Sequence, residues 1–275
     1  MLFRKSQSEA FSMPDAAALS SVARELILET SARTGTPHVS SSLSVVDILV
    51  SLGLAGEKQG LGREIYLSKG HAALAMYSSL VAIGLLPREV MQEYCTDGSV
   101  FEGHVNSRIP GIPLSTGSLG HAAPYAAGRA MGDLVLGKIN HHWVVLSDGE
   151  LDEGSNWESL LIASHRKLAN FHIVIDRNRI QSLGSTEDTS ALEPLADKLR
   201  AFGLRVNEVS GHDHDAISDH VILAESCGAP TALIANTIKG KGLKDIEENA
   251  VLYHYKPATQ DHLHAFQYST RDHLN

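Results

Sequence analysis

The sequence predicts an α/β fold in which a doubly wound, mainly parallel sheet carries helices on both faces. Short apolar runs, such as residues 143–146 and 171–175, alternate with helical segments through the second half of the chain, which is typical of a parallel sheet covered on both sides. The 275 residues are 43% hydrophobic and 20% charged, as in globular proteins with a sizeable core. Ligands of such folds bind at the carboxyl ends of the strands.

The first half of the chain is predicted to begin with a helix near Pro14, because proline suits the first helical turn, where its missing N–H costs nothing. Leu19, Leu26 and Ile27 recur on one face of this helix, and the breaker at residues 34–37 ends it. The next predicted elements are a helix over 43–52, a strand over 65–67, a helix over 70–83, a loop over 101–118 and a helix over 119–132.

The second half is predicted to alternate strands and helices regularly. Residues 1–12 are expected to form a loose polar tail, and residues 13–275 a single domain, because no repeat or linker interrupts them. Strands are expected over 143–146, 171–175, 204–209 and 231–236, and helices over 156–165, 195–202 and 215–225.

Composition argues against several classes of partner. Lys and Arg total 23 and Asp and Glu total 32, so the formal charge is −9, and a chain without a basic run is a poor candidate for nucleic-acid binding. No segment reaches the ~18 apolar residues that span a bilayer, and no apolar run follows Arg4 and Lys5 as in a secretory signal. Cys95 and Cys227 lack metal-ligand spacing. We therefore expect no membrane contact and a cytoplasmic location.

The sharpest local feature is the segment 146–154, which follows a predicted strand and precedes a helix. Asp148 stands at the carboxyl end of that strand, and Gly149 lets the backbone approach a phosphate at a helix start. The next strand ends just before Asn178, so both side chains are expected at the same edge of the sheet. With one backbone carbonyl, two diphosphate oxygens and a water, these hard oxygen donors would complete an octahedron around Mg²⁺.

Each half of this pattern also has an ordinary explanation. Asp-Gly after a strand is usually a turn, and Asn in that position is often a helix cap. The pair is more specific, because Asp148 and Asn178 are 178 − 148 = 30 residues apart with one predicted helix between them.

This pair, Asp148-Gly149 followed by Asn178, resembles the metal and diphosphate motif of thiamine-diphosphate enzymes. Further segments resemble transketolase in particular, in the order of that family, so that the resemblance runs from about residue 15 to residue 260. They are Leu-Ser-Lys-Gly-His-Ala at 67–72, Gly103-His104, Ser-Thr-Gly-Ser-Leu-Gly at 115–120, and Ile-Lys-Gly-Lys-Gly at 238–242 with His254 downstream.

The resemblance implies a thiamine-diphosphate-binding fold and a set of site residues. Asp148, Asn178 and the backbone carbonyl of Ile180 would hold Mg²⁺, for which Ca²⁺ or Mn²⁺ can substitute. Glu153 would lie close behind the metal, where it could orient ligands or contact a partner. The residues implied in cofactor binding are His71, Gly117, Leu119, Gly149, Glu153 and Asn178.

Four histidines resemble those that line the family's substrate channel, and the resemblance makes them the catalytic candidates. Ketol transfer moves protons among hydroxyl and carbonyl groups, which imidazoles do well near neutral pH. They are His38, His71, His104 and His254, while the remaining histidines match no motif and are expected to be structural or exposed.

Three departures from the family pattern concern the donor end of this site. Ser147 replaces the usual glycine before the motif aspartate and is expected to crowd the diphosphate. His38-Val39-Ser40 replaces His-Pro-Gly, so that the loop is expected to take another path. His121 stands where glutamine is common.

The chain is less than half the length of a full transketolase, which adds a pyrimidine-binding domain and a C-terminal domain. The resemblance therefore implies the N-terminal subunit of a split transketolase, which moves a two-carbon ketol unit from a ketose or its phosphate to an aldose acceptor. The glutamate that activates the cofactor would lie on a separate partner chain. We expect a homodimer core with two partner chains (α2β2), and no appreciable activity of this chain alone.

Three alternatives remain open from the sequence. One is the α-type subunit of a 2-oxoacid dehydrogenase, and another is a split enzyme that delivers a two-carbon unit to an unusual acceptor. The third is a non-catalytic scaffold homologue, which need bind no cofactor. A nicotinamide-binding module is disfavoured, because no predicted strand is followed by Gly-x-Gly-x-x-Gly.

Overall fold

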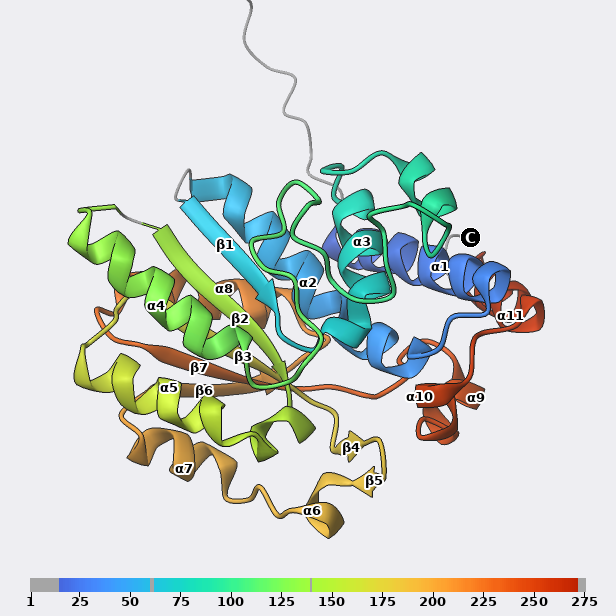
Figure 1. Cartoon of the computed structure of the whole chain (residues 1–275). Coiled ribbons are helices and arrows are strands. Elements are labelled where there is room, and N and C mark those ends of the chain that lie inside the picture. Colours follow the sequence, from blue (N-terminus) through green and yellow to red (C-terminus); the bar gives the residue numbers. More distant parts are fainter. Residues whose placement is uncertain (1–14, 60–61, 139, 272–275) are drawn as a thin grey trace, which may run out of the picture.

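The computed structural model describes residues 15–59, 62–138 and 140–271 (Figure 1). The predicted tail over 1–12, and Pro14, lie outside the described residues. The first helix, α1 (Ala16–Thr34), is capped by Asp15, whose carboxylate accepts the Ala17 N–H at 3.1 Å. It ends at Gly35, whose left-handed backbone (φ +71°) suits a residue without Cβ.

A five-stranded parallel sheet forms the centre of the molecule (Figure 1). The central strands are buried along nearly their whole length, which explains why they appear in the sequence as continuous apolar runs rather than alternating ones. The fold class predicted from the sequence is thus confirmed. In spatial order the strands are β1 (Gly62–Leu67), β2 (Asn140–Ser147), β3 (Phe171–Arg177), β7 (Thr231–Asn236) and β6 (Arg205–Ser210).

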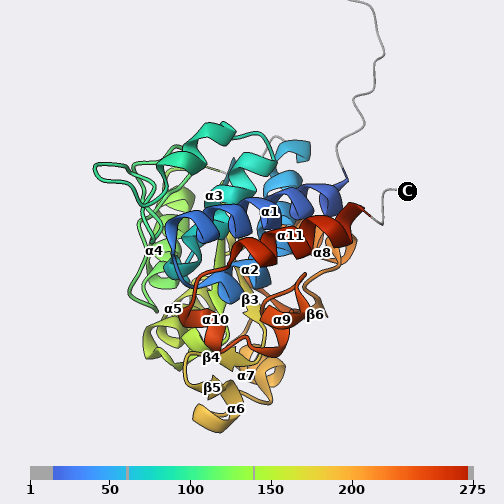
Figure 2. The same cartoon turned by 90° about the vertical axis from the view of Figure 1, so that its right-hand side faces the viewer.

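Helices cover both faces of the sheet, and each face has its own apolar core (Figures 1 and 2). On one face, α2 and α8 lie on the sheet. The helices α1 and α3 pack against α2 and against each other, and α11 packs against α1. The other face is covered by α4, α5 and α7. The bounds are α2 (Val39–Gln59), α3 (Ala73–Ala82), α4 (Ala122–Val135), α5 (Gly154–His165), α7 (Leu195–Ala201), α8 (His214–Ser226) and α11 (Gln260–Arg271).

The chain passes from β3 to the edge strand β6 and then returns to β7, which lies between them, and this change of direction positions the site. The connections from β1 to β2, β3 and then β6 advance across the sheet, with α4, α5 and α7 on one face. The connection from β6 back to β7 runs through α8 on the opposite face, as right-handed crossovers require when the direction reverses. A crevice therefore opens at the carboxyl ends of β3 and β7, where ligands of open α/β sheets bind.

Apart from η1, which lies within a predicted helix, the remaining short elements were not predicted from the sequence, and several predicted elements have other limits. The predicted helix 43–52 is part of the longer α2, and the predicted helix 70–83 begins with a 3₁₀ turn before α3. The predicted loop 101–118 contains no helix or strand, as expected. None of the described helices has the length and apolarity to span a membrane. The short elements are η1 (Gly70–Ala72), η2 (Arg88–Glu93), η3 (Gly149–Asp152), β4 (Ile180–Gln181), β5 (Gly184–Ser185), α6 (Thr186–Thr189), α9 (Lys244–Glu248) and α10 (Leu252–Tyr255).

Candidate functional site

A cavity of about 270 Å³ lies at the carboxyl ends of β1, β2, β3 and β7. Segments that are far apart in the sequence meet here because parallel strands deliver all their carboxyl ends to one edge. Ten of the eleven residues predicted for the site line this cavity: His38, His71, His104, Gly117, Leu119, Asp148, Gly149, Asn178, Ile180 and His254.

The two predicted metal-binding side chains stand at the ends of neighbouring strands. Ser147 pairs in register with Asp176, so Asp148 and Asn178 directly follow β2 and β3. The carboxylate of Asp148 is buried and accepts the Gly149 N–H at 2.9 Å. Burial and the neighbouring carboxylate of Asp176 raise the pKa of Asp148. A divalent cation would relieve this unfavourable burial of negative charge.

A buried ion pair between Lys69 and Asp176 lies at the same edge of the sheet. Lys69 Nζ lies 2.6 Å from Asp176 Oδ2, and both side chains are essentially inaccessible to solvent. Lys69 also donates to the Ser41 carbonyl at 3.1 Å, and Ser44 Oγ donates to Asp176 at 2.7 Å. Burial alone would raise the pKa of Asp176, but Lys69 and the hydroxyl donors hold it below its ordinary value. The pair thus fixes the start of α2 to the end of β3.

A second lysine in the cavity is buried without a carboxylate partner. Lys239 is 4% exposed, and its ammonium donates to the Ile180 carbonyl at 2.7 Å, whereas no carboxylate of the described chain forms an ion pair with it. Burial and the nearby Lys69 lower the pKa of Lys239 to about 8. A buried cation with no countercharge is costly unless an anion binds beside it.

These features fit the implied cofactor and metal. Carboxylate, amide and carbonyl oxygens are suitable donors for Mg²⁺. The ammonium of Lys239, which donates to the Ile180 carbonyl and forms no ion pair with a described carboxylate, suits a diphosphate; the second lone pair of that carbonyl stays available to the metal. A Cβ on Gly117 would make only an ordinary van der Waals contact, 3.4 Å from the ring of His104. Within the described residues, no group of three His, Cys, Asp or Glu side chains could hold a metal, but the expected site uses only one such side chain.

Three histidine rings face one another in the cavity. The ring centroids of His38 and His71 are 5.2 Å apart, those of His38 and His254 are 4.9 Å apart, and those of His71 and His254 are 5.6 Å apart. Burial, followed by the surrounding cationic groups, lowers all three pKa values, that of His254 to about 3. These imidazoles are therefore neutral near pH 7, and each can accept a hydrogen bond at one ring nitrogen and donate one from the other.

His38 has one ring nitrogen ready for a ligand. Its Nδ1 is buried and has no hydrogen-bond partner in the part of the chain that the structure describes. Its backbone has a φ of +67° and donates to the His254 carbonyl at 3.2 Å. The departure at Val39-Ser40 lets α2 begin directly after His38, and Ser40 Oγ donates to the Ala250 carbonyl at 2.9 Å.

The glycine-rich segments are held close together around the site. A Cβ on Gly70 would lie 2.3 Å from the Thr116 carbonyl oxygen, so this contact requires glycine. Thr116 Oγ1 donates to the Leu67 carbonyl at 2.7 Å, and Tyr77 donates its hydroxyl proton to the His104 carbonyl at 2.9 Å. The loop that carries His104 and the end of β1 are thereby fixed relative to each other.

Glu153 is the one predicted residue that does not line the cavity. It is exposed and precedes α5 as its capping position. Its neighbour Glu150 is fully buried instead, and its carboxylate accepts the Gly120 N–H at 2.8 Å and the Ser68 hydroxyl. Glu150 therefore links the ends of β1 and β2 to the Gly117–Gly120 turn.

Three functional candidates were missed from the sequence, namely Lys69, Lys239 and Glu150. All three lie inside motifs that were recognised, so the signal for them was present. The signal for the two lysines is that each stands directly before a glycine inside a recognised motif, Lys69 before Gly70 and Lys239 before Gly240.

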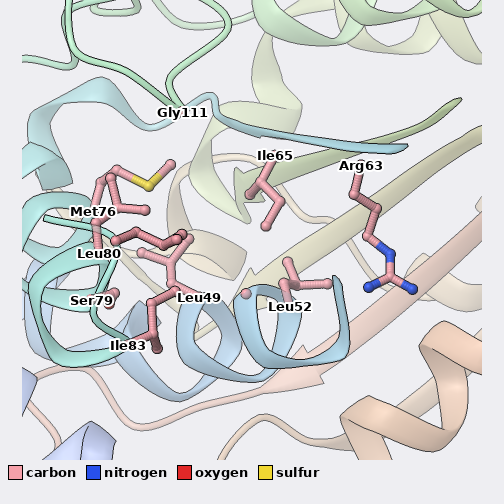
Figure 3. Close-up of a pocket in the computed structure, with 11 residues that line it drawn as sticks. Leu49, Leu52, Arg63, Ile65, Met76, Ser79, Leu80, Ile83 and Gly111 are labelled. Carbon is pink, nitrogen blue, oxygen red and sulfur yellow. The ribbon is translucent and has the colours of Figure 1, made fainter. Parts of the chain in front are cut away.

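A second cavity of about 270 Å³ lies between α2, β1 and α3 (Figure 3). Its lining is mainly apolar and includes Leu49, Leu52 and Met76. The guanidinium of Arg63 at one end already pairs with Glu225, with Nη2 and Oε2 2.6 Å apart. Apart from Arg63 and Ser79, the residues that line this cavity carry no polar side chain.

Comparisons with known proteins identify the family. The family model described as "Transketolase, thiamine diphosphate binding domain" matches residues 57–269. The chain is 36% identical over 244 residues to an apulose-4-phosphate transketolase subunit of Actinobacillus succinogenes, covering 86% of this chain and 88% of that protein. It is 35% identical over 230 residues to the 6-deoxy-6-sulfo-D-fructose transketolase subunit SqwG of a Clostridium species, covering 80% and 84%.

Solved structures show the same fold in longer proteins. The transketolase of Leishmania mexicana superimposes with a TM-score of 0.82 at 22% identity over 94% of this chain, but over only 41% of its own length. The chain thus spans about two fifths of the solved transketolases. The family match and the sequence relatives together show that this chain belongs to the transketolase family and carries its thiamine diphosphate-binding domain.

Proposed function

We propose that the chain is the N-terminal subunit of a two-chain transketolase, which moves a two-carbon ketol unit from a ketose or ketose phosphate to an aldose acceptor. The observation that carries this proposal is the single cavity in which oxygen donors, an unpaired buried lysine and neutral histidines meet. Metal-binding groups, an anion site and proton acceptors are the three elements that such a reaction needs from this half of a site.

The residues of the cavity have distinct roles in holding the cofactor. Thiamine diphosphate, when bound, supplies the chemistry that breaks and forms the C–C bond. Asp148, Asn178 and the Ile180 carbonyl would hold Mg²⁺, or Ca²⁺ or Mn²⁺ in its place, against the diphosphate. Lys239 offers its ammonium to the same anion, and Gly149 lets the backbone come close to it.

The histidines would handle the protons and orient the sugar. Neutral His38, His71 and His254 can accept a hydrogen bond from a hydroxyl of the donor sugar, or donate a hydrogen bond to its carbonyl oxygen. The unpartnered Nδ1 of His38 suits one such contact. His104, held by Tyr77 through its carbonyl, lines the same cavity.

The rest of the enzyme is proposed to come from other chains. The relatives named as transketolase subunits have about the length of this chain, whereas the solved transketolases are more than twice as long. A partner that carries the pyrimidine-binding domain would complete the site, in an α2β2 assembly in which residues 13–275 form a single diphosphate-binding domain. Both cysteines are free, which agrees with a cytoplasmic location.

Binding and turnover of the purified chain test this proposal. In calorimetric titrations of the chain together with its partner subunit, thiamine diphosphate should bind saturably only when Mg²⁺ is present. Asp148→Ala should abolish the Mg²⁺-dependent binding, because it removes the only charged donor of the metal site. Asp197→Ala, which removes an exposed carboxylate on α7, is the matched control and should bind as the unmodified chain does.

Two results would contradict the proposal. Undiminished cofactor affinity of Asp148→Ala would remove the metal assignment. Ketol transfer by this chain alone, with thiamine diphosphate and Mg²⁺ but no partner subunit, would refute the shared site.

A further inference from the structure

The structure assigns a role to Arg177, the last residue of β3, which no motif or proposed catalytic step uses. We propose that its guanidinium positions the metal-binding carboxylate of Asp148, and ties to it the segment that supplies the other two oxygen donors. This inference rests on the proposed function and names a positioning residue for its metal site.

Arg177 is buried among oxygen acceptors from three directions. Its side chain is 1% exposed. Nη1 donates to Asp148 Oδ2 at 3.2 Å and to Thr186 Oγ1 at 2.7 Å. Nη2 donates to Glu187 Oε1 at 2.7 Å and to Glu193 Oε1 at 2.9 Å. One planar group thus contacts the end of β2 and both ends of a loop that begins at α6.

The chain path makes these contacts relevant to the metal. Directly after Arg177 the chain supplies Asn178 and the Ile180 carbonyl, and then forms the small antiparallel sheet of β4 and β5. It next enters α6 and returns to the guanidinium through Glu187 and Glu193. The segment 178–193 is therefore joined to Arg177 covalently at its start and by hydrogen bonds from Glu187 and Glu193 near its end. The guanidinium, together with the Arg179 N–H that donates to Asp148 Oδ2 at 2.5 Å, ties Asp148 to the segment that carries the other two donors.

The charges around Arg177 explain how a cation can stand beside a cation site. A lone guanidinium touching a metal-binding carboxylate would oppose a divalent ion. Here, three carboxylates, those of Asp148, Glu187 and Glu193, surround Arg177. Only one other guanidinium of the described residues pairs with them, since Arg179 Nη1 lies 3.8 Å from Glu193 Oε1. The group keeps a net negative charge, so it orients Asp148 without repelling the metal. Lysine could not replace it, because the two Nη atoms of arginine bond four separate acceptors here, more than the three protons of one ammonium can serve.

Metal binding by the full chain tests this role without measuring turnover. Mn²⁺ is titrated in the presence of saturating thiamine diphosphate and the partner chain, and free Mn²⁺ is followed by electron paramagnetic resonance. We expect Arg177→Met to weaken Mn²⁺ binding about 10–100-fold, as loss of groups that orient metal ligands typically does. Arg200→Met removes an exposed arginine that pairs with Asp197 on α7, and should leave the Kd within about twofold of the unmodified chain.

Arg177→Lys separates positioning from folding. It keeps the positive charge but bonds to fewer acceptors, so we expect a folded chain with a Kd for Mn²⁺ raised at least about fivefold. Thermal unfolding checks the fold of each variant. The spectrum of bound Mn²⁺, which reports the symmetry of its oxygen ligands, should change in Arg177→Lys and stay unchanged in Arg200→Met.

The outcomes distinguish the two proposals. An unchanged Kd and an unchanged Mn²⁺ spectrum in folded Arg177→Lys would overturn the positioning role and leave the proposed function intact. If the unmodified chain binds no Mn²⁺ with thiamine diphosphate and the partner chain present, the proposed function fails and the role of Arg177 fails with it.

Discussion

Two groups of buried histidines lie near opposite ends of the sheet, and they differ in what their rings contact. At the carboxyl ends, His38, His71 and His254 surround a cavity. Toward the amino ends, His172 is sandwiched among packed side chains: its ring stacks on Trp143 with centroids 4.4 Å apart, and Nε2 lies 3.0 Å from His141 Nδ1.

The comparison shows that burial and a lowered pKa do not identify a catalytic histidine. Burial lowers the pKa of His172 and of His71 well below the ordinary value in both groups. Both ring nitrogens of His172 have partners, since Nδ1 also contacts Thr231 Oγ1 at 2.9 Å. The His38 ring, in contrast, keeps an unpartnered nitrogen beside a cavity. Access to a ligand distinguishes the two groups.

The largest expected effect contrasts one histidine from each group. His71→Ala should lower kcat of the reconstituted enzyme about 10²–10⁴-fold while the fold is retained, because one positioned proton donor or acceptor contributes that much. His172→Gln should lower the free energy of unfolding and leave kcat unchanged, since it disturbs packing far from the cavity. Steady-state kinetics and denaturant titrations of both variants measure this. A kcat that falls equally in both would show that the two groups are not functionally distinct.

The two buried lysines allow a second contrast at the carboxyl edge. Lys239→Met should weaken thiamine diphosphate binding about 10–100-fold, since a hydrogen bond from a charged group contributes about 1.5–3 kcal/mol. It should not destabilise the fold, because no carboxylate loses its partner. Lys69→Met, in contrast, leaves Asp176 buried without its countercharge, and should lower the free energy of unfolding by about 3–5 kcal/mol.

Calorimetry and denaturant titrations measure these two effects. Lys244→Met, which removes an exposed lysine on α9, is the control for the change of charge. Equal cofactor affinity of Lys239→Met and Lys244→Met would exclude Lys239 from the anion site.

The smallest expected effect is a pH dependence of stability from His220, which lies against Trp143 with ring centroids 6.1 Å apart. Burial lowers the pKa of His220 to about 4 from its ordinary 6.5. Between these values the unfolded chain binds a proton that the folded chain does not, so stability falls as the pH drops from 6.5 toward 4. This site should contribute a loss of about 2 kcal/mol at pH 5.

Denaturant titrations at pH 7.5 and pH 5 measure this contribution. His220→Leu removes the proton-binding site, so its free energy of unfolding should fall less between the two pH values than that of the unmodified chain. Equal decreases in both proteins would show that His220 titrates normally in the fold.

Much of the fold and part of the site could be predicted from local sequence. The apolar runs of β2, β3 and β7 are buried on both faces, so they stand out as strands without knowledge of their neighbours. The pair of Asp148 and Asn178 was predictable, because adjacent parallel strands place the residues that follow them at one edge. The motif residues were predicted to share a site, and ten of eleven line one cavity.

The short elements after β3 and β7 could not be predicted from local patterns. Elements of two to five residues, such as β4, α6 and α9, have too few positions to show a period. The helix α11 places Leu263 and Phe266 in the core formed with α1, but that burial depends on contacts with a segment more than two hundred residues earlier.

The sequence by itself determined the fold class, the family and the donors at the ends of two strands, because these depend on residues close together along the chain. Only the tertiary structure decided which charges are paired. Among the described residues, Lys69 pairs with Asp176, Lys239 donates to a carbonyl and to no carboxylate, and Arg177 contacts three carboxylates. The physical reason is that the free energy of a buried charge depends on the groups around it, and here distant segments bring those groups together.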